Sequence, residues 1–501
     1  MQSAATNPDM IHVVCKADNR QHAVVSIPPS VDQKLSSSSL RARPVLLGLT
    51  SNNLSYARGG DVLHWWKTYP VPPNAPSPYN DQSLWGIVPA WGYATVTESN
   101  VPGISRDSLL WGYWPTSTSP TLLRLEPSEP EGHWVEVSSH RQQLMPIYNR
   151  YEQIHSDEEE ELDERAWTAL FQGMWLAGYL LSEYVFPDPG AREPVHPLGA
   201  ASKLPWSSDE ADLSSAFVVV LGASTKVARS FTWCLFDWPR ASGPLGLVQF
   251  TSSPGVLQEV ADREGWGDVS KAFAYTEIDQ ATGWIEGLQP TKVVIIDCGA
   301  RENVLSQICQ NLQESAPRPY KTVILHVGSQ QKVYTTEEVQ EARAAMQSLG
   351  KIQYNTSGIQ DTIIDREGAA TYFGKVSRRW KGWLADRGSA IPDMRLVWGQ
   401  GIEGEDGIYG GWERLSNGEV RPEEGLSGSR ARPEVMCPFY GIGIPPLGAN
   451  HEGGPVRATA IIAQEGEELI FAVTNLSSEP SAGAGASTGL VEGSQCRIPL
   501  N

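Results

Sequence analysis

A glycine-led turn after a strongly apolar run is the best candidate for ligand chemistry in this chain. Residues 217–221 are all apolar, and the sequence continues through Gly222 and Ala223 into a helical pattern. The free N–H groups and the dipole at the start of a helix favour an anion. The candidate phosphate ligands are therefore Gly222, Ser224, Thr225 and Lys226. The alternative is a tight structural turn capped by a serine.

The turn carries only part of the dinucleotide fingerprint, which would require glycines at positions 222, 224 and 227. Gly222 is present, but Ser224 and Val227 occupy the other two positions. The middle glycine normally lets the backbone approach a pyrophosphate, and the third allows close helix packing. Ser224 still offers a small side chain and a hydroxyl. We therefore predict phosphate binding at this turn without the complete fingerprint.

The end of the next apolar run indicates which dinucleotide would fit. Residues 247–250 are followed by Thr251, Ser252 and Ser253, with no carboxylate. NAD sites usually carry an acidic residue here for the ribose 2′-hydroxyl. Hydroxyl groups suit a 2′-phosphate better, although no arginine lies nearby in the sequence. Thr251 and Ser252 are accordingly predicted cofactor contacts, and NADP is the predicted cofactor.

Other catalytic signatures are missing from the sequence. The six cysteines and nine histidines are dispersed, so we predict no metal site. No phosphate-loop sequence G-x-x-x-x-G-K occurs, and the turn at Gly222 lacks the trailing glycine of a hydrolase elbow. Tyr372 and Lys375 are spaced one residue too closely for the Tyr-x-x-x-Lys pair of short-chain dehydrogenases.

The elements around these residues alternate between apolar strands and helices. Strand patterns at 217–221, 247–250, 271–275, 292–297 and 322–327 are separated by helical patterns that include 256–263 and 303–312. Strands that are apolar throughout are typical of a parallel sheet covered by helices on both faces. We therefore predict an α/β protein with a Rossmann-type, doubly wound parallel sheet over residues 210–375.

The remaining segments predict a second domain and two less regular ends. Short β-type runs and a helical pattern near 167–181 predict a β-rich domain over residues 41–185. We expect disorder over 1–40, a return of the chain to the first domain over 376–426, and an appendage of uncertain order over 427–501. Shorter patterns predict helices at 337–349 and 373–385, a strand at 394–398, and a strand pair at 458–462 and 468–473.

Composition narrows the class of protein. The chain has 501 residues, long enough for two domains, and a net charge of −19, which argues against a nucleic-acid or anionic-membrane partner. It contains neither an apolar run long enough to span a bilayer nor a secretory signal. With widely spaced cysteines, these features favour a cytoplasmic protein with a small-molecule substrate.

The sequence resembles a fungal and bacterial family called domain of unknown function 2855 (DUF2855), and more broadly the medium-chain dehydrogenases and reductases. Matching segments lie at 49–57, 85–93, 113–117, 222–226, 251–254 and 412–420, together with His140, Arg141, Tyr148 and Asn149. The resemblance covers about residues 40–426 and implies a GroES-like first domain. The residues after Ser427 match no pattern of the family.

The resemblance also implies a site. In the zinc-free quinone and enoyl reductases of that superfamily, an asparagine early in the first domain lies near the nicotinamide, and Asn53 looks like that residue. Tyr56 falls three positions later and could donate a proton to a carbonyl or enolate oxygen. The alternative is that Asn52 and Asn53 form a turn and Tyr56 packs. The implied substrate contacts in the interdomain cleft are Tyr113, Ser117 and Tyr148.

Three functional hypotheses follow. The first is a zinc-independent, NADP(H)-dependent oxidoreductase of medium-chain reductase type, acting on an enone, quinone or carbonyl compound in secondary metabolism. The second is a reductase-derived isomerase, cyclase or carbon–carbon lyase that no longer transfers hydride, because two fingerprint glycines are missing. The third is a non-catalytic binding protein. A homodimer is an open alternative for the assembly.

Overall fold

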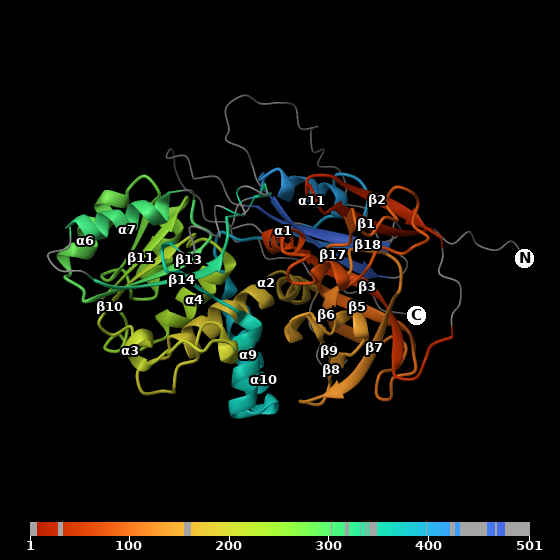
Figure 1. Cartoon of the computed structure of the whole chain (residues 1–501), viewed down its shortest axis with the longest axis horizontal. Helices are drawn as coiled ribbons and strands as arrows, with labels where there is room; N and C mark the ends of the chain where they lie inside the picture. Colours follow the sequence, from red (N-terminus) through yellow and green to blue (C-terminus); the bar gives the residue numbers. More distant parts are fainter. Residues whose placement is uncertain are drawn as a thin grey trace, which may run out of the picture.

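The computed structural model describes most of the chain between residues 8 and 420, together with three strands beyond it. The described ranges are 8–28, 34–154, 162–301, 303–315, 320–330, 332–335, 338, 340, 348–396, 398–420, 426–430, 458–465 and 468–475. A parallel sheet with its helices and a larger, mostly antiparallel sheet form two lobes, and α2 (Leu162–Leu180) runs between them (Figure 1). The predicted α/β architecture is confirmed.

The strand order of the first lobe identifies it as a doubly wound sheet. Its six strands are parallel and lie in the order β12-β11-β10-β13-β14-β15. In chain order this is 3-2-1-4-5-6, the Rossmann arrangement, whose direction of winding reverses between β10 and β13. The strands are β10 (Ala216–Leu221), β11 (Gly246–Thr251), β12 (Ser270–Ala274), β13 (Lys292–Cys298), β14 (Lys321–Gly328) and β15 (Ile352–Gln353).

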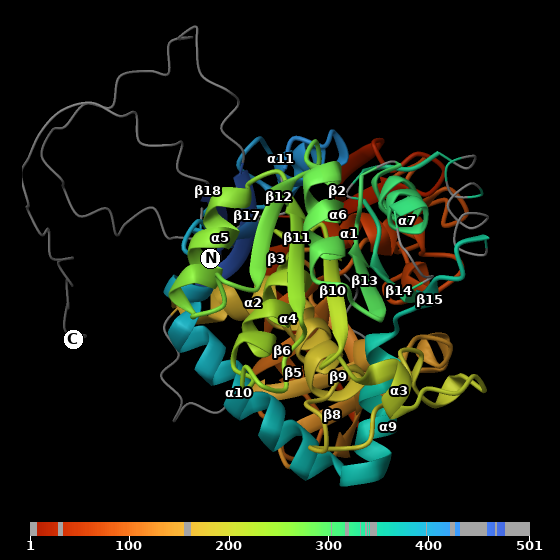
Figure 2. The same ribbon diagram turned by 90° about the vertical axis from the view of Figure 1, so that its left-hand side faces the viewer.

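Helices cover both faces of this sheet, as the uniformly apolar strands require. Phe217 and Val219 of β10 pack in one cluster with α6 (Ile278–Gly287) and α7 (Val304–Ser315). Val218 and Val220 point the other way and share a cluster with α4 (Lys226–Phe236) and α5 (Pro254–Arg263). Figure 2 shows α6 in front of the strands. Because side chains alternate along a strand, one apolar run serves both layers.

The second lobe contains a closed antiparallel barrel. Its strands follow one another in the order β3-β5-β6-β9-β8-β7, and β7 pairs back onto β3. They are β3 (Ser39–Leu49), β5 (Ala90–Ser99), β6 (Leu109–Trp114), β7 (Thr121–Ser128), β8 (His133–Glu136) and β9 (Arg150–Ile154). This barrel is the β-rich domain that the sequence predicts. A short helix, α1 (Ser51–Arg58), follows β3 and faces the first lobe.

The prediction of disorder over residues 1–40 is wrong for the described part of that segment. β1 (Asp9–Cys15) pairs with β2 (His22–Ile27) and with β4 (Trp85–Gly86) in a three-stranded sheet. Ile11, Val13 and Val14 are almost completely buried. Burial of these apolar side chains stabilises β1, although the sequence around this short strand, close to a serine tract, predicts little regular structure.

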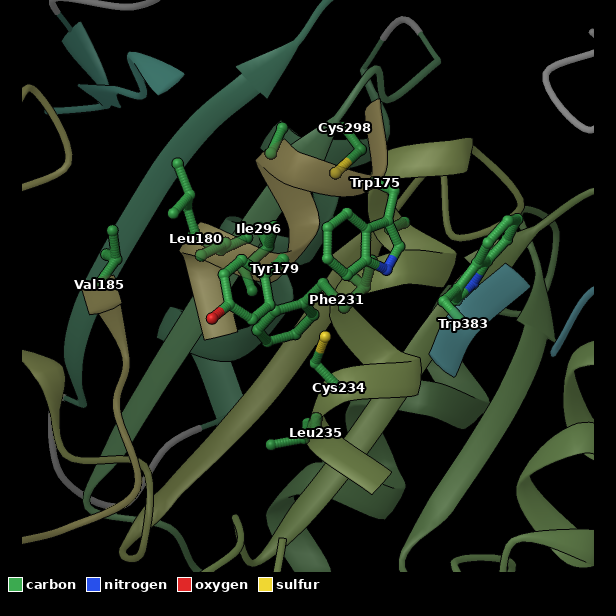
Figure 3. Packing of buried hydrophobic residues seen from close by; sticks show 14 of the residues in the cluster. Trp175, Tyr179, Leu180, Val185, Phe231, Cys234, Leu235, Ile296, Cys298 and Trp383 are labelled. Atoms are coloured by element: carbon green, nitrogen blue, oxygen red, sulfur yellow. The ribbon is translucent and has the colours of Figure 1, made fainter. Parts of the chain in front are cut away.

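α2 joins the two lobes through an aromatic core (Figure 3). Trp175 and Tyr179 of α2 lie against Phe231 and Cys234 of α4, and Trp383 of α10 (Ala369–Ala390) belongs to the same cluster. α2 continues as a short π-helix over Leu181–Val185. The other helices and turns are α3 (Ser208–Ala211), α9 (Thr356–Glu367), α10 (Ala369–Ala390), α11 (Ile408–Ser416) and short 3-10 turns at Trp65–Lys67, Ser139–Arg141, Pro146–Asn149 and Gly199–Ala201.

The C-terminal segments fulfil only some expectations. α11 packs Trp412 and Leu415 into the core of the barrel lobe. The strand predicted at 394–398 is wrong for its described residues, because Met394 closes a turn onto Ile391 and is buried without a strand partner. The helix predicted at 337–349 lies largely outside the described residues. The predicted strand pair is confirmed: β17 (Ala458–Glu465) and β18 (Glu468–Asn475) are antiparallel, and β17 and β16 (Leu426–Arg430) both pair with β3.

Candidate functional site

A cleft of about 660 Å³ lies between the two lobes. It opens at the carboxyl ends of β10, β13 and β14, which is where ligands bind in open parallel sheets whose winding reverses. The barrel lobe contributes α1 and the residue before it, and α2 contributes Met174. The lining residues are Thr50, Ser51, Asn52, Leu54, Ser55, Arg58, Met174, Thr225, Lys226, Val227, Cys298, Val327, Gly328, Ser329, Gln330 and Lys332.

The predicted turn borders this cleft, and its first glycine is required by the backbone. Gly222 has φ +69°, and a Cβ there would lie 3.1 Å from the carbonyl oxygen of Cys298. The N–H of Thr225 donates to the carbonyl of Gly222 at 2.9 Å, and the Thr225 side chain caps α4 by accepting from the N–H of Ala228. Thr225 and Lys226 therefore present the start of α4 to the cleft.

Ser224 and Thr251 occupy a different position from the one expected. Both are buried, and their hydroxyl groups are hydrogen-bonded to each other. Thr251 Oγ1 also accepts the N–H of Ser253 at 3.0 Å. Neither side chain lines the cleft, and their contact with a cofactor stays a prediction. Their hydrogen bond instead joins the turn after β10 to the end of β11. Ser252, which follows β11, is exposed.

The charge of the cleft is opposite to that of the whole chain. Arg58, Lys226 and Lys332 line it, and its described lining includes no Asp or Glu. The Arg58 guanidinium lies 4.4 Å from the ring centre of Tyr334. Burial lowers the pKa of Arg58. Lys332 donates to Glu338 at 2.8 Å. In a chain of net charge −19, a cationic cleft favours an anionic ligand.

Asn53 stabilises the start of α1 and does not line the cleft. Its Oδ1 accepts the N–H of Thr50 at 2.6 Å, which completes a capping box. Its Nδ2 donates to the carbonyl of Pro89 at 2.9 Å, and the side chain is 1% exposed. The structural alternative for Asn53 therefore describes its position. The preceding residue, Asn52, lines the cleft.

Tyr56 lies behind Asn52, inside an aromatic cluster. Its hydroxyl accepts Asn52 Nδ2 at 2.7 Å and Trp91 Nε1 at 3.0 Å. Its ring packs edge-on against Trp65 and Tyr113. Burial raises the pKa of Tyr56 to about 12, although its hydrogen bonds act in the opposite direction. The phenol is therefore protonated at neutral pH and meets the cleft only through Asn52.

The three predicted substrate residues do not line the cleft, which corrects that expectation. The ring centres of Tyr113 and Tyr148 are 4.9 Å apart within the aromatic cluster behind α1. Ser117 is buried, and its hydroxyl donates to the carbonyl of Met10 at 3.2 Å, so that it holds β1. The sequence motifs that contain these three residues therefore reflect packing inside the barrel lobe.

A buried ion cluster that the sequence analysis missed supports the floor of the cleft. Asp297, at the end of β13, accepts Lys351 Nζ at 3.0 Å and lies 3.6 Å from His326 Nδ1. It also accepts the N–H groups of Gly299 and Ala300. Burial raises the pKa of this carboxyl, but His326, Lys351 and the backbone donors outweigh it and lower the pKa to about 2. Apart from its place at a strand end, Asp297 gave no sequence signal.

Within the described part of the chain, no group of three or more His, Cys, Asp or Glu side chains could hold a metal ion. The described helices include none that is long and apolar enough to cross a membrane.

The comparison with protein families identifies the chain. The family described as "Protein of unknown function (DUF2855)" matches residues 47–421. The chain belongs to this family. The match of the DUF2855 family spans both lobes, including α1, the turn at Gly222 and α11. A comparison with curated proteins found no match.

Solved structures resemble this DUF2855 protein only distantly. CurK enoyl reductase is 10% identical with a TM-score of 0.39, over 76% of this chain and 89% of that one. CurA from Vibrio vulnificus in complex with NADPH is 9% identical with a TM-score of 0.36, over 75% and 89%. The mitochondrial 2-enoyl thioester reductase Etr1p/Etr2p heterodimer from Candida tropicalis is 9% identical with a TM-score of 0.38, over 75% and 89%. Similarity at this level says nothing about what this chain binds.

Proposed function

We propose that this DUF2855 protein is a zinc-independent, NADP(H)-dependent oxidoreductase that acts on an enone, quinone or carbonyl compound. The observation that carries the proposal is the cationic cleft at the winding reversal of the parallel sheet, bordered by the start of α4. Dinucleotides are anionic and bind at this position in sheets of the same strand order. Cytoplasmic location, a role in secondary metabolism and a homodimeric assembly remain predictions.

The turn and its neighbours would hold the anionic part of the cofactor. The positive φ of Gly222 keeps the turn free of a Cβ beside Cys298, and Thr225 and Lys226 border the cleft at the start of α4. Backbone N–H groups and the helix dipole favour a pyrophosphate there. Ser252 directly follows β11 and is exposed, so its hydroxyl is the proposed contact for a ribose 2′-phosphate.

Asn52 and Tyr56 would orient the substrate. A bound nicotinamide supplies or accepts a hydride; the chain must then polarise the carbonyl oxygen. Asn52 Nδ2 has a second N–H that has no acceptor among the described residues, and it lies on the cleft wall. Tyr56 fixes the amide through its first N–H. We therefore assign the contact with the substrate to Asn52 and a positioning role to Tyr56.

A reductase-derived enzyme without hydride chemistry is the second candidate. The observation in its favour is that Ser224 and Thr251 bond to each other, which leaves fewer hydroxyl groups for a cofactor than a complete dinucleotide site would have. Such an isomerase, cyclase or lyase would use the same cationic cleft for an anionic substrate. The third hypothesis, a non-catalytic binding protein, has no specific observation beyond the cleft itself.

Cofactor titration separates these candidates. The purified chain is titrated with NADPH, NADH and inorganic pyrophosphate while tryptophan fluorescence is followed. The proposal expects saturable NADPH binding that pyrophosphate weakens by competition, and tighter binding of NADPH than of NADH. Ser252→Asp should reduce the preference for NADPH, because the carboxylate repels a 2′-phosphate. Pyrophosphate binding without NADPH binding at millimolar concentration would support the second candidate and overturn the first.

A further inference from the structure

A second cavity, of about 770 Å³, lies on the opposite side of α2 from the cleft. Gln172, Gly173 and Leu176 line the cavity, whereas Met174 lines the cleft. Successive residues of a helix are turned by about 100°, which places Met174 about 160° around the axis from Gln172 and Leu176 and about 100° from Gly173. The remaining walls come from the barrel lobe, from α9 and from α10. The cavity is therefore separate from the candidate active site.

The walls of this cavity are aromatic. The rings of Trp91 and Trp111 stack with their centres 4.8 Å apart and their planes inclined by 19°. Phe373 of α10 lines another wall. A stacked pair of indoles leaves its outer faces and ring edges for a ligand, and a planar ring system can pack flat against such an outer face. The shape of the cavity thus favours a flat aromatic ligand.

Gly173 keeps the cavity open. Glycine in the middle of a helix costs roughly 1 kcal/mol relative to alanine. Gly178 in the same helix has a packing reason, since a Cβ there would lie 2.6 Å from the backbone N of Phe231. At Gly173 a Cβ would meet only Trp91, at an ordinary contact distance of 3.5 Å. No close packing explains this glycine, but a larger side chain would occupy the cavity.

Arg150 gives the cavity a positive group. Its guanidinium lies 4.6 Å from the ring centre of Phe373 and donates to the carbonyl of Glu129 at 3.3 Å. Within the described residues it forms no ion pair; the carboxyl of Asp361 acts on it only at longer range, and burial lowers the pKa of Arg150. Glu152 also lines the cavity, so its described lining carries one guanidinium and one carboxylate. An anionic ligand group placed against Arg150 would form a charge-assisted hydrogen bond with the guanidinium.

Several other polar side chains border the same space; they are Gln172, His133, Glu152, Gln360 and Ser377. The Oε1 of Gln172 is buried and has no hydrogen-bond partner among the described residues. Rotation of its amide would bring this acceptor, or the amide donor, to a ligand. His133 lies 3.9 Å from Glu152, and burial lowers the pKa of His133 to about 4, so that it is neutral at physiological pH. His133 therefore offers a hydrogen bond without adding charge.

We propose that this cavity is a second binding site, for a planar aromatic carboxylate whose rings pack against the Trp91–Trp111 pair and whose acid group pairs with Arg150. Trp91 also donates to the hydroxyl of Tyr56, which in turn holds Asn52 at the cleft. An occupant therefore touches the first member of a hydrogen-bonded chain that ends at the candidate active site.

Binding of 2-naphthoate, measured by quenching of tryptophan fluorescence, tests the proposal, with neutral 2-naphthamide as the matched probe. The wild-type chain should bind the carboxylate at least about tenfold more tightly than the amide, because the acid pairs with Arg150. Arg150→Gln should remove this difference. Gly173→Leu should weaken both probes about tenfold or more by filling the cavity, whereas Gly283→Leu, at an exposed glycine of α6 with open space around it, should not.

A second cavity-filling variant and a competition experiment serve as controls. If Gly173→Leu fails to fold, Ser377→Trp replaces it, because Ser377 is exposed and lines the same cavity. Saturating NADPH or pyrophosphate should leave 2-naphthoate bound. Displacement of the probe by either ligand, or unchanged affinity in the cavity-filling variant, would overturn the proposal. This site does not depend on the proposed reductase function, so each can fail alone.

Discussion

Asn52 Nδ2 donates to the hydroxyl of Tyr56 at 2.7 Å, and this bond connects the wall of the cleft to the aromatic core of the barrel lobe. The neighbouring Asn53 turns the other way and caps α1. Two adjacent asparagines therefore have different roles, one in contact with solvent in the cleft and one in the scaffold. The first prediction separates them.

Asn53→Ala should destabilise the protein, and Asn52→Ala should impair ligand turnover or binding. Loss of the Asn53 amide leaves the N–H of Thr50 and the carbonyl of Pro89 without partners, at a cost of about 1–3 kcal/mol. Thermal denaturation should show a lower midpoint for Asn53→Ala and a nearly unchanged one for Asn52→Ala. The opposite pattern would contradict the assignment of Asn52 to the cleft.

Gly222→Ala should cost about 1–2 kcal/mol of stability and weaken NADPH binding. The cost arises because φ +69° strains an L-residue and because the new Cβ would meet the carbonyl of Cys298. Gly190→Ala is the matched control: Gly190 has φ +82° but nothing within 4 Å. Both variants should lower the midpoint of unfolding, and only Gly222→Ala should change the cofactor titration. Equal cofactor affinity in the two variants would remove the turn from the binding site.

Neutralising the cleft should weaken anion binding. Arg58→Gln and Lys332→Gln should each reduce affinity for pyrophosphate and NADPH several-fold at low salt, with a smaller effect at high salt, because screening shortens the reach of charge. Arg106→Gln is a suitable control, since Arg106 is 75% exposed and pairs weakly with Asp107 away from the cleft. A loss of affinity equal to that of the control would show that the cations do not bind the ligand.

Acid should destabilise the N-terminal sheet. Burial lowers the pKa of His22 to about 4 and holds the pKa of His12 well below its ordinary value, in a pair whose ring nitrogens lie 3.0 Å apart. The unfolded chain binds these protons near pH 6.5, whereas the folded chain resists them, so stability rises with pH between about 4 and 6.5. The unfolding midpoint should therefore fall as pH is lowered through this window.

His22→Gln provides the internal control for that experiment. This variant removes one titrating group and the repulsion that a second proton would meet, so its midpoint should depend less steeply on pH between 6.5 and 4. His133 also has a pKa lowered to about 4 by burial, and it should preserve part of the slope in the variant. An unchanged slope would assign the pH dependence to other groups.

The sequence alone determined the parallel sheet and its first turn. A strand that is apolar throughout, such as 217–221, requires cover on both faces of the sheet. The turn that follows it has a positive φ at Gly222, a conformation that glycine adopts without strain. The buried strand and the glycine turn depend on side-chain polarity and backbone freedom within a few residues, so a single sequence is enough to predict them. The family resemblance was equally local, since it rested on short ordered motifs, and the family match over residues 47–421 confirmed it.

Only the tertiary structure decided which side chains meet. Asn52 and Asn53 are indistinguishable in sequence, but a turn of about 100° per helical residue sends one to the cleft and one to the cap. Arg58 and Lys332 come from different lobes and form a cationic wall only because α2 and its aromatic core hold those lobes together. Burial and charge at such a site depend on contacts between distant segments, and the order of residues along the chain does not encode those distances directly.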